Sequence, residues 1–350
     1  MHETRSFNSP LVSSISLTNF EIGWTCAECD ERNAEHDPAP WTGNTLLNET
    51  ENGQMYAGMC RLDGGLVSFG CNDFYPEEAP VRQIAVEPFL LDISPVTNAQ
   101  FAAFVDETRY VTLAETAPNP DDYPGILPHM MVAGSIVFAP PPKGQPVGPE
   151  SWWAYVPGAS WRQPYGPVDG CIVPDDHPVV HIAYCDALAY SNWSGKRLPT
   201  EVELEFAARG GIAQSTFAWG NELFPDGKVM ANFWPKGFPF KHPDRRGPPY
   251  TTPVGQYPAN AYGLFDMIGN VWEWTSSDAY GRPGNKGCCP AAGAERSLNP
   301  NTYKVLKGGS HLCSPDYCQR YRPAAKWFQP IDTSTSHVGF RCAQSIANGI

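Results

Sequence analysis

The sequence predicts a globular protein of the α+β class in which loops outnumber helices and strands. Its 350 residues are 42% hydrophobic, which is enough to bury a sizeable core. The 36 prolines and 32 glycines are too many for long helices or a coiled coil, because each of them interrupts regular structure. They are spread along the chain without a repeat, which excludes a collagen-like polymer and a solenoid.

The chain divides into two parts of different character. Residues 1–55 are polar, rich in Asn and Glu and poor in hydrophobic periodicity, and we interpret them as an N-terminal extension. Residues 56–350 are predicted to form a single folded domain. Within it, residues 66–70 follow the turn Gly64-Gly65 and are predicted to be a strand, and residues 84–92 are predicted to be another.

Three helices are predicted from their capping signals and apolar spacing. The first covers residues 97–105, with Thr97 as its cap, and the second covers residues 183–195. The third begins at Thr200, where Glu203 has capping-box spacing, and it stops at Gly210. Residues 117–180 and 212–262 hold much of the Pro, Gly and aromatic content, and we interpret these long irregular segments as functional surface.

Charge and targeting signals narrow the class of protein. The 24 basic and 37 acidic residues give a net charge of −13, which argues against nucleic-acid or anionic-membrane partners, since both need clustered Lys and Arg. The N-terminus lacks the apolar core of a signal peptide, and no run approaches the roughly 18 apolar residues that span a bilayer. We therefore expect a cytoplasmic monomer. In such a reducing compartment the 11 cysteines are metal ligands, redox groups or buried thiols rather than disulfides.

Cys313 and Cys318 are the cysteines with the clearest chemical context. They are five residues apart with Pro315 between them, so a bent loop rather than a helix is expected to bring their sulfurs together. Two thiolates without other ligands suit a soft, low-coordinate ion such as Cu(I), and they also suit a reversible disulfide. From spacing alone, two buried or bridged structural cysteines are the first interpretation.

Nine sequence blocks around this pair change that interpretation, because they occur in the order found in the formylglycine-generating enzymes. The chain resembles this family over roughly residues 60 to 344. The Gly308-Gly309-Ser310 sequence followed by the cysteine pair is the specific part, since non-catalytic members of the wider family lack the pair. The other blocks are residues 77–80, 95–101, 152–162, 176–181, 195–201, 262–275, 320–322 and 339–342.

The resemblance implies a single domain with a distorted C-type-lectin-like fold that is low in regular secondary structure. It also implies a reaction in which O₂ oxidises a cysteine of a sulfatase-type peptide, or of an unfolded sulfatase, to Cα-formylglycine. By this resemblance Cys313 and Cys318 hold Cu(I), and the substrate thiolate joins them as a third sulfur. Ser310 is expected to line the oxygen pocket, Trp272 to form part of its wall, and Tyr317 to orient the site.

The resemblance further implies bound Ca²⁺. Asp266, Glu273 and the carbonyl groups of Gly269 and Val271 fall on the positions of a calcium-binding loop, and hard oxygen donors of this kind suit the ion. A possible second calcium site matches at Asn232 and at the carbonyl of Phe233. Its expected acidic position is occupied by Arg246, with Asp244 nearby.

The substrate groove departs from the family pattern. Trp152 aligns with a groove-lining Trp, but Lys326 stands where the family usually has Arg, and Lys cannot reproduce the bidentate fork of Arg. Gly134 falls near the position of an acidic residue that receives the Arg of the Cys-x-Pro-x-Arg substrate. We therefore expect the chain to retain the reaction of the family, whereas its peptide preference can differ.

The remaining cysteines also depart from the pattern. The family's disulfide partners are missing, since Ser191 stands where Cys342 would need a cysteine, and Ala208 and Pro323 stand at the ends of the other bridge. Cys185 lies six residues before Ser191, so its pairing with Cys342 is doubtful. Cys26 and Cys29 have the spacing of half a zinc site, which Cys60, Cys71 or His36 could complete; unliganded thiols are the other interpretation. Cys288 and Cys289 cannot be interpreted.

Three other functions remain open at this stage. The chain could be a relative that oxidises a different peptide or a small thiol at the same copper site. It could be a non-catalytic, lectin-like binding module, against which the joint presence of both cysteines and Ser310 argues. A cysteine hydrolase would need a nearby base, and His311 is the only adjacent candidate.

Overall fold

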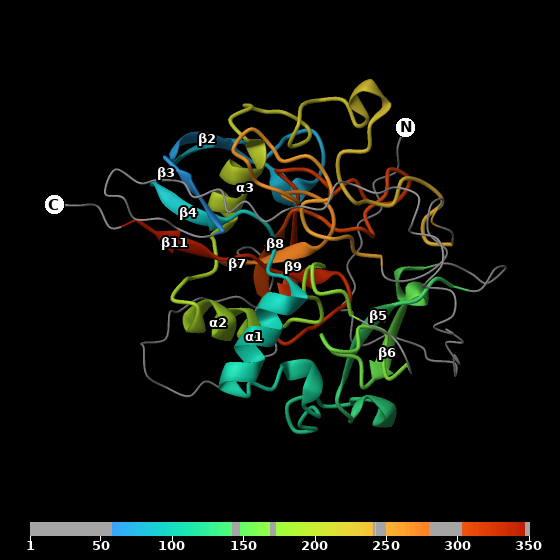
Figure 1. Cartoon of the computed structure of the whole chain (residues 1–350). Helices are drawn as coiled ribbons and strands as arrows, with labels where there is room; N and C mark the ends of the chain where they lie inside the picture. The colour runs from blue at the N-terminus through green and yellow to red at the C-terminus, as the bar shows by residue number, and fades with distance from the viewer. Residues whose placement is uncertain are drawn as a thin grey trace.

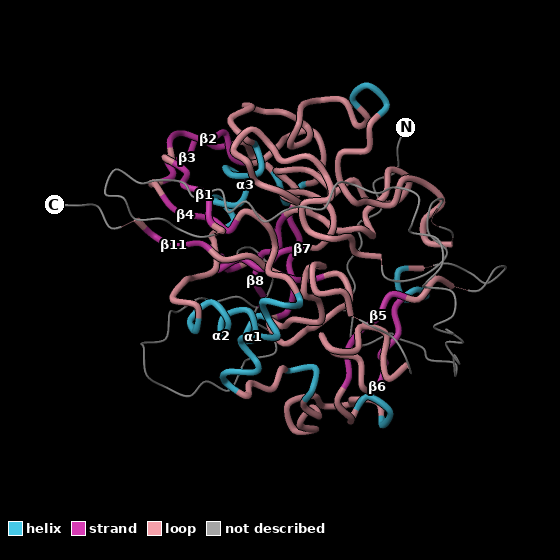
Figure 2. The backbone as a smooth tube through the Cα atoms, in the orientation of Figure 1, coloured by secondary structure: helices cyan, strands magenta, loops and turns pink. Residues whose placement is uncertain are grey.

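The computed structural model describes residues 58–141, 148–168, 173–240, 242, 250–279 and 303–346. The predicted extension 1–55 lies outside these residues, as do Cys26, Cys29, His36, Asp244, Arg246, Cys288 and Cys289. Loops and turns make up most of the described chain (Figure 2), as the proline and glycine content predicts. No helix in the described ranges is long and apolar enough to cross a membrane.

The strands form small sheets rather than one large one (Figure 1). A four-stranded sheet has the order β10-β7-β8-β9, a three-stranded sheet has the order β1-β4-β11, and β2-β3 and β5-β6 are two-stranded. The strand bounds are β1 (Met59–Leu62), β2 (Gly65–Phe69), β3 (Arg82–Val86), β4 (Phe89–Asp92), β5 (Gly134–Phe138), β6 (Trp153–Pro157), β7 (Trp272–Asp278), β8 (Tyr303–Lys307), β9 (Lys326–Pro330), β10 (Val338–Gly339) and β11 (Ala343–Ser345).

The strand predictions are confirmed in part. Strand β2 covers the predicted segment after Gly64-Gly65. The single strand predicted over residues 84–92 is wrong, because the chain breaks at Glu87-Pro88 into β3, which pairs with β2, and β4, which lies between β1 and β11. Pro88 has no N–H group to donate to a ladder, so the break falls where one strand would lose a hydrogen bond. The hairpin β5-β6 lies inside a segment that was predicted to be irregular.

The three predicted helices are confirmed. They are α1 (Asn98–Thr108), α2 (Tyr184–Trp193) and α3 (Glu201–Arg209). Both predicted capping boxes are present: Thr97 accepts from the amide of Gln100, and Thr200 accepts from the amide of Glu203. Helix α3 ends at Gly210, whose φ of 54° is left-handed and favours glycine. The shorter 3-10 helices are η2 (Pro76–Glu78), η3 (Leu113–Glu115), η4 (Pro128–Met130), η5 (Pro149–Trp152) and η6 (Pro225–Gly227).

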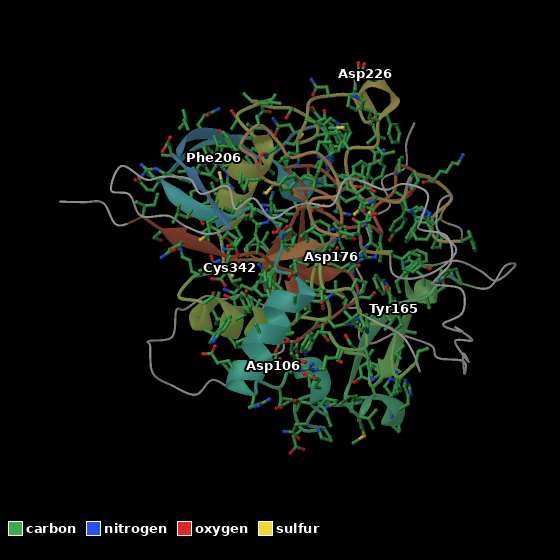
Figure 3. The ribbon with its side chains drawn as sticks, in the orientation of Figure 1. Asp106, Tyr165, Asp176, Phe206, Asp226 and Cys342 are labelled. Carbon is green, nitrogen blue, oxygen red and sulfur yellow. The ribbon has the colours of Figure 1, made fainter. Side chains whose placement is uncertain are left out.

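One main apolar core joins these elements. Helices α1 and α2 lie side by side (Figure 1) and interlock through Phe101, Phe104 and Tyr190, which also contacts Phe340 near the C-terminus. Phe206 of α3 and Cys342, both labelled in Figure 3, belong to the same buried cluster, as does Cys313. A second, aromatic cluster of Phe138, Trp152, Trp234, Tyr250 and Leu312 connects the β5-β6 hairpin to the loop that carries the cysteine pair.

Candidate active site

The cysteine loop begins where β8 ends. Gly309 has a φ of 74°, and an added Cβ atom there would overlap the carbonyl oxygen of Arg320, so the two ends of the loop approach too closely for any side chain at this position. Ser310 follows; it is fully buried, and its carbonyl accepts a hydrogen bond from the amide of Cys313 at 3.0 Å. The start of the loop is thereby packed against its return.

A tight turn brings the two cysteines together. The amide of Ser314 donates to the carbonyl of Cys318 at 3.0 Å, and the amide of Tyr317 donates to the carbonyl of Ser314 at 3.1 Å. Within this turn the Cys313 thiol donates a hydrogen bond to the Cys318 sulfur, and both cysteines are free. The structure therefore has the bent loop and the paired sulfurs that the spacing predicts.

The surroundings shift the pKa values of the two thiols in opposite directions. Burial, followed by the hydrogen bond to Cys318, raises the pKa of the Cys313 thiol well above its usual range. The hydrogen bond from Cys313 lowers the pKa of Cys318, and the charge of Arg320 lowers it further, against an opposing effect of burial. The first proton to leave the pair therefore comes from Cys318, and Cys313 stabilises the resulting thiolate.

Backbone and carboxylate contacts hold the loop from a second side. The amide of Trp234 donates to the carbonyl of Cys313 at 2.9 Å, and the amide of Gly237 donates to Asp316 Oδ2 at 2.8 Å. The other oxygen of Asp316 accepts from the Ser314 hydroxyl inside the turn. Residues 234–237 and the turn are thus fastened at two points.

Two ion pairs hold the return of the loop. Arg322 donates two hydrogen bonds to Glu78, at 2.5 and 2.9 Å, and both side chains are buried. Arg320 pairs with Glu77 at 2.5 Å. Because Glu77 and Glu78 are consecutive residues of η2, these pairs dock one short helix against the segment that follows Cys318.

Aromatic side chains border the outer side of the turn. The Tyr317 ring lies edge-on to Trp152, with centroids 5.3 Å apart, and stacks on Phe238 at 4.9 Å. Tyr317 is 47% exposed whereas Trp152 is 5% exposed, so Tyr317 offers the accessible surface beside Cys318. Phe240, which is 43% exposed, continues this region along the chain.

The other expected site residues occupy distinct positions. Trp272 begins β7 and is buried in the same cluster as Cys313, and its amide donates to the carbonyl of His337 at 2.9 Å. His311 is buried, and its Nδ1 donates to the carbonyl of Asn270 at 2.7 Å. The imidazole of His311 therefore does not point into solvent, and one of its nitrogens is committed to the backbone.

Lys326 forms an ion pair inside the protein. Its ammonium group is buried, pairs with Glu201 at 3.2 Å and lies 5.3 Å from the centroid of Phe69. Its assignment as a substrate-binding residue stays a prediction, and in this structure its charge is paired with the Glu201 carboxylate of α3. Gly134 lies in β5, where an added Cβ would be 2.6 Å from the carbonyl oxygen of Val156 and 3.0 Å from Tyr155. A side chain of any kind, acidic ones included, has no room there.

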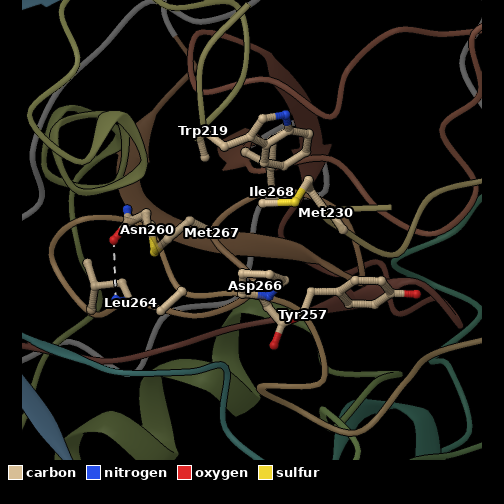
Figure 4. Close-up of a pocket in the computed structure, with 12 residues that line it drawn as sticks. Trp219, Met230, Tyr257, Asn260, Leu264, Asp266, Met267 and Ile268 are labelled. Carbon is tan, nitrogen blue, oxygen red and sulfur yellow. Dashed lines mark hydrogen bonds between the residues drawn. The ribbon is translucent and has the colours of Figure 1, made fainter. Parts of the chain in front are cut away.

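The residues expected to bind calcium differ in how well their surroundings suit a cation. Asp266 lines a small pocket of about 30 Å³ (Figure 4), and its Oδ1 is buried without a hydrogen-bond partner. A pocket of this size admits a water or an ion rather than an organic ligand. Glu273 is buried and accepts two hydrogen bonds from Arg341, at 2.7 and 2.8 Å, so only its remaining lone pairs are available to a cation. Burial raises the pKa of Asp266 to about 6.

The possible second calcium site has weaker support. The side-chain amide of Asn232 donates to the carbonyl of Tyr250 and to Asn270 Oδ1, at 2.9 and 3.1 Å. Phe233 is buried and stacks on Tyr321. Within the described ranges, no three or more His, Cys, Asp or Glu side chains gather as a metal site, so any ion here would depend on carbonyl or substrate ligands as well.

The sulfur pair fits a soft cation by the same criteria. Both thiols are free, and the Cys313 thiol donates a hydrogen bond to the Cys318 sulfur. Two adjacent sulfur donors suit Cu(I) and leave a position open for a third ligand. By contrast, Cys60 donates to the carbonyl of Tyr262 at 3.1 Å and Cys71 lies 4.0 Å from Asp73, so neither is placed with the pair.

Sequence reasoning missed four residues that shape the site. Glu77, Arg320, Phe238 and Asp316 each contact the cysteine turn or its flanks, yet none was given a role. Glu77 and Arg320 stand in two of the recognised blocks, which is the signal that could have identified them. Asp316 lies between the cysteines, where a carboxylate next to Pro315 is typical of a turn that hydrogen-bonds its own backbone.

Comparisons with known proteins agree with this architecture. The family model described as "Sulfatase-modifying factor enzyme 1-like domain" matches residues 44–346. The formylglycine-generating enzyme of Mycobacterium tuberculosis is 45% identical over 305 residues, which are 84% of this chain and 100% of that protein. The formylglycine-generating enzyme of Bos taurus is 38% identical over 298 residues, covering 81% of this chain and 74% of that protein.

Identity alone does not separate active from inactive relatives. The Bos taurus protein named inactive C-alpha-formylglycine-generating enzyme 2 is 36% identical over 300 residues, covering 84% of this chain and 90% of that protein. Among solved structures, PvdO from Pseudomonas aeruginosa matches with a TM-score of 0.52 at 20% identity over 85% of this chain and 97% of that chain. This likeness shows the fold alone, and it confirms the predicted single domain with little regular secondary structure.

Proposed function

The chain belongs to the sulfatase-modifying factor enzyme 1-like family, and from this premise we propose that it converts a cysteine of a sulfatase polypeptide to formylglycine. The observation that carries the proposal is the contact between the free thiols of Cys313 and Cys318 in a loop held on several sides. A non-catalytic binding module would not need two free thiols in contact. The names of the relatives support the same reaction.

We propose Cu(I) as the cofactor and O₂ as the oxidant. Cys313 and Cys318 would hold the ion, and bound copper would supply the chemistry that lets O₂ react with a thiolate. The reaction balances when the substrate cysteine and O₂ take up two electrons and two protons from a thiol reductant and yield the aldehyde, hydrogen sulfide and water.

The residues of the chain have the remaining tasks. Cys313 and Ser310 are buried, so water is kept from the inner side of the sulfur pair. Cys318 is half-buried and lies beside the exposed Tyr317 ring, which places the entry for a peptide on that side. Trp152 and Phe238 pack against the Tyr317 ring and fix its orientation. Rigid rings of this kind orient an extended peptide with little loss of entropy.

We further propose that peptide selection differs from the Cys-x-Pro-x-Arg preference implied by the resemblance. Neither Gly134 nor Lys326 offers a group to a substrate arginine, since the first has no room for a side chain and the second is paired with Glu201. The partner is therefore a cysteine peptide in which the arginine contributes little to binding. A small thiol as substrate is the alternative, and the absence of aldehyde from both peptides in the experiment below would favour it.

The experiment offers two peptides to the full-length chain with Cu(I) and a thiol reductant under air. One carries Cys-x-Pro-x-Arg and the other has Ala in place of the Arg, and aldehyde is trapped with an aminooxy reagent and identified by mass spectrometry. We expect aldehyde from both peptides at similar kcat/KM. Cys313→Ser and Cys318→Ser should abolish it, and Cys71→Ser, at a cysteine outside the site, should not. Retained turnover in Cys318→Ser would sink the assignment.

A further inference from the structure

Arg320 is the cation nearest in sequence to the sulfur pair, and its side chain is enclosed on three sides. Its Nη2 pairs with Glu77 at 2.5 Å, its guanidinium carbon lies 3.8 Å from the centroid of Tyr75, and 4.9 Å from that of Trp327. Only 14% of the side chain is exposed. A guanidinium held by a carboxylate and two rings has one orientation, which a Lys could not reproduce.

The same enclosure is bonded to the backbone beside Cys318. The Tyr75 hydroxyl accepts from the amide of Gln319 at 3.2 Å, so the ring that stacks on Arg320 also fixes the residue between Cys318 and Arg320. The sulfur pair and the cation are therefore positioned by one set of contacts.

The two neighbouring arginines differ in how they use their donors. Arg322 gives two hydrogen bonds to Glu78 and a third, from Nε, to the carbonyl of Gln319 at 2.6 Å. The Nε of Arg320 is buried and has no hydrogen-bond partner. The donors of Arg322 are thus bonded within the fold, whereas Arg320, two residues after Cys318, keeps a buried donor without a hydrogen-bond partner.

We propose that Arg320 is a positioning residue that offsets the negative charge of the sulfur pair when the pair binds a monovalent cation. Two thiolates and one Cu(I) carry one net negative charge, and a buried charge is costly unless it is paired. Glu77 and Tyr75 orient the guanidinium for this task. The inference rests on the proposed copper-dependent function and deepens it.

A purely structural role predicts different behaviour. If Arg320 only docks η2 against the loop, Arg320→Lys and Arg320→Met should be equally harmful, because both lose the forked pair with Glu77 and the flat stacking on Tyr75. If the charge is needed, Lys should retain much of the effect that Met loses. The comparison of the two variants therefore separates the two roles.

The test measures the affinity of the full-length chain for Cu(I) without oxygen, by competition with a chromophoric Cu(I) chelator. We expect Arg320→Met to bind roughly 10- to 100-fold more weakly than wild type, and Arg320→Lys to fall between them. The matched control is Arg162→Met, which removes a guanidinium that stacks on Trp161 at 4.1 Å and lies 3.9 Å from Asp106. The control should bind as wild type does, and melting curves should show that all variants are folded.

The outcomes separate this inference from the proposed function. Wild-type affinity in Arg320→Met overturns the inference and leaves the proposed function intact, as does equal weakening in the Lys and Met variants. If wild type itself binds no Cu(I), the copper proposal is wrong, and the inference, which rests on it, is overturned with it.

Discussion

The backbone amide of Ser314 donates a hydrogen bond to the carbonyl of Cys318 at 3.0 Å, and this bond closes the turn on which the candidate active site depends. It converts a separation of five residues into a contact between two sulfurs. The turn has little regular structure of its own, so its shape depends on the groups that hold it from outside. Each of those groups offers a test.

Asp316 fastens the turn to residues 234–237, and its loss should reduce activity more than stability. Asp316→Ala removes the acceptors of Gly237 and Ser314, so we expect kcat/KM to fall by roughly ten- to a hundredfold through misplacement of the sulfurs. Asp316 is exposed, so the free energy of unfolding should change by less than about 1 kcal/mol. Asp316→Asn keeps one acceptor and should be intermediate. Unchanged kinetics in the Ala variant would show that the turn keeps its shape without the contacts of Asp316.

Glu78 and Arg322 form a buried pair that should dominate the stability of this region. Glu78→Gln leaves a buried guanidinium without its countercharge, and we expect a loss of about 3–5 kcal/mol in the free energy of unfolding, measured with urea. The control is Asp63→Asn at the exposed pair with Arg61, where the loss should stay below about 1 kcal/mol. Similar losses at both pairs would contradict the buried role of Glu78.

Two buried histidines should make the protein sensitive to acid. Burial lowers the pKa of His181 to about 4, and burial together with the charge of His181 lowers that of His337 to about 3. The unfolded chain titrates near 6.5, so it binds more protons than the folded chain below that pH. The stability contributed by these neutral imidazoles is therefore present above about pH 6.5 and is lost as the pH falls.

The measurement is the free energy of unfolding at pH 7 and pH 5, compared between variants. Asp186 and Asp266 have pKa values raised to about 6 by burial and act in the opposite direction, so wild type alone does not isolate the histidines. His337→Asn should lose less stability than wild type between the two pH values, whereas Asn at the exposed His129 should follow wild type. Parallel profiles for all three proteins would rule out this source of acid sensitivity.

Calcium should stabilise the chain through Asp266. Its buried Oδ1 has no hydrogen-bond partner, so a bound ion would give this oxygen the partner that it lacks. At a Ca²⁺ concentration a hundred times the Kd, binding adds about 2.7 kcal/mol to the free energy of unfolding. We expect a higher Tm in Ca²⁺ than in EDTA for wild type and no difference for Asp266→Asn. Asn tolerates the left-handed φ of 51° at this position, so the variant should fold. Identical wild-type Tm values in Ca²⁺ and EDTA would contradict the site.

Local features could be predicted from the sequence because their causes lie within a few residues. The capping boxes at Thr97 and Thr200 and the bent loop around Pro315 are of this kind. The pairing of β7, β8 and β9 and the pair between Glu77 and Arg320 depend on contacts between distant residues, and no periodicity records them. The ion pair of Lys326 could not be predicted from its aligned position, because its partner Glu201 lies on a helix 125 residues away in the sequence.

The most direct test of the account asks whether the sulfur pair, copper and oxygen are all required. The chain is prepared free of metal and loaded with Cu(I), and each form is incubated with a thiol reductant and a cysteine peptide under air and under argon. Mass spectrometry then follows loss of sulfur and gain of one oxygen in the peptide. We predict product only in the Cu(I)-loaded sample under air, and none with Cys318→Ser. Equal product from the metal-free chain, or from the loaded chain under argon, would contradict the account.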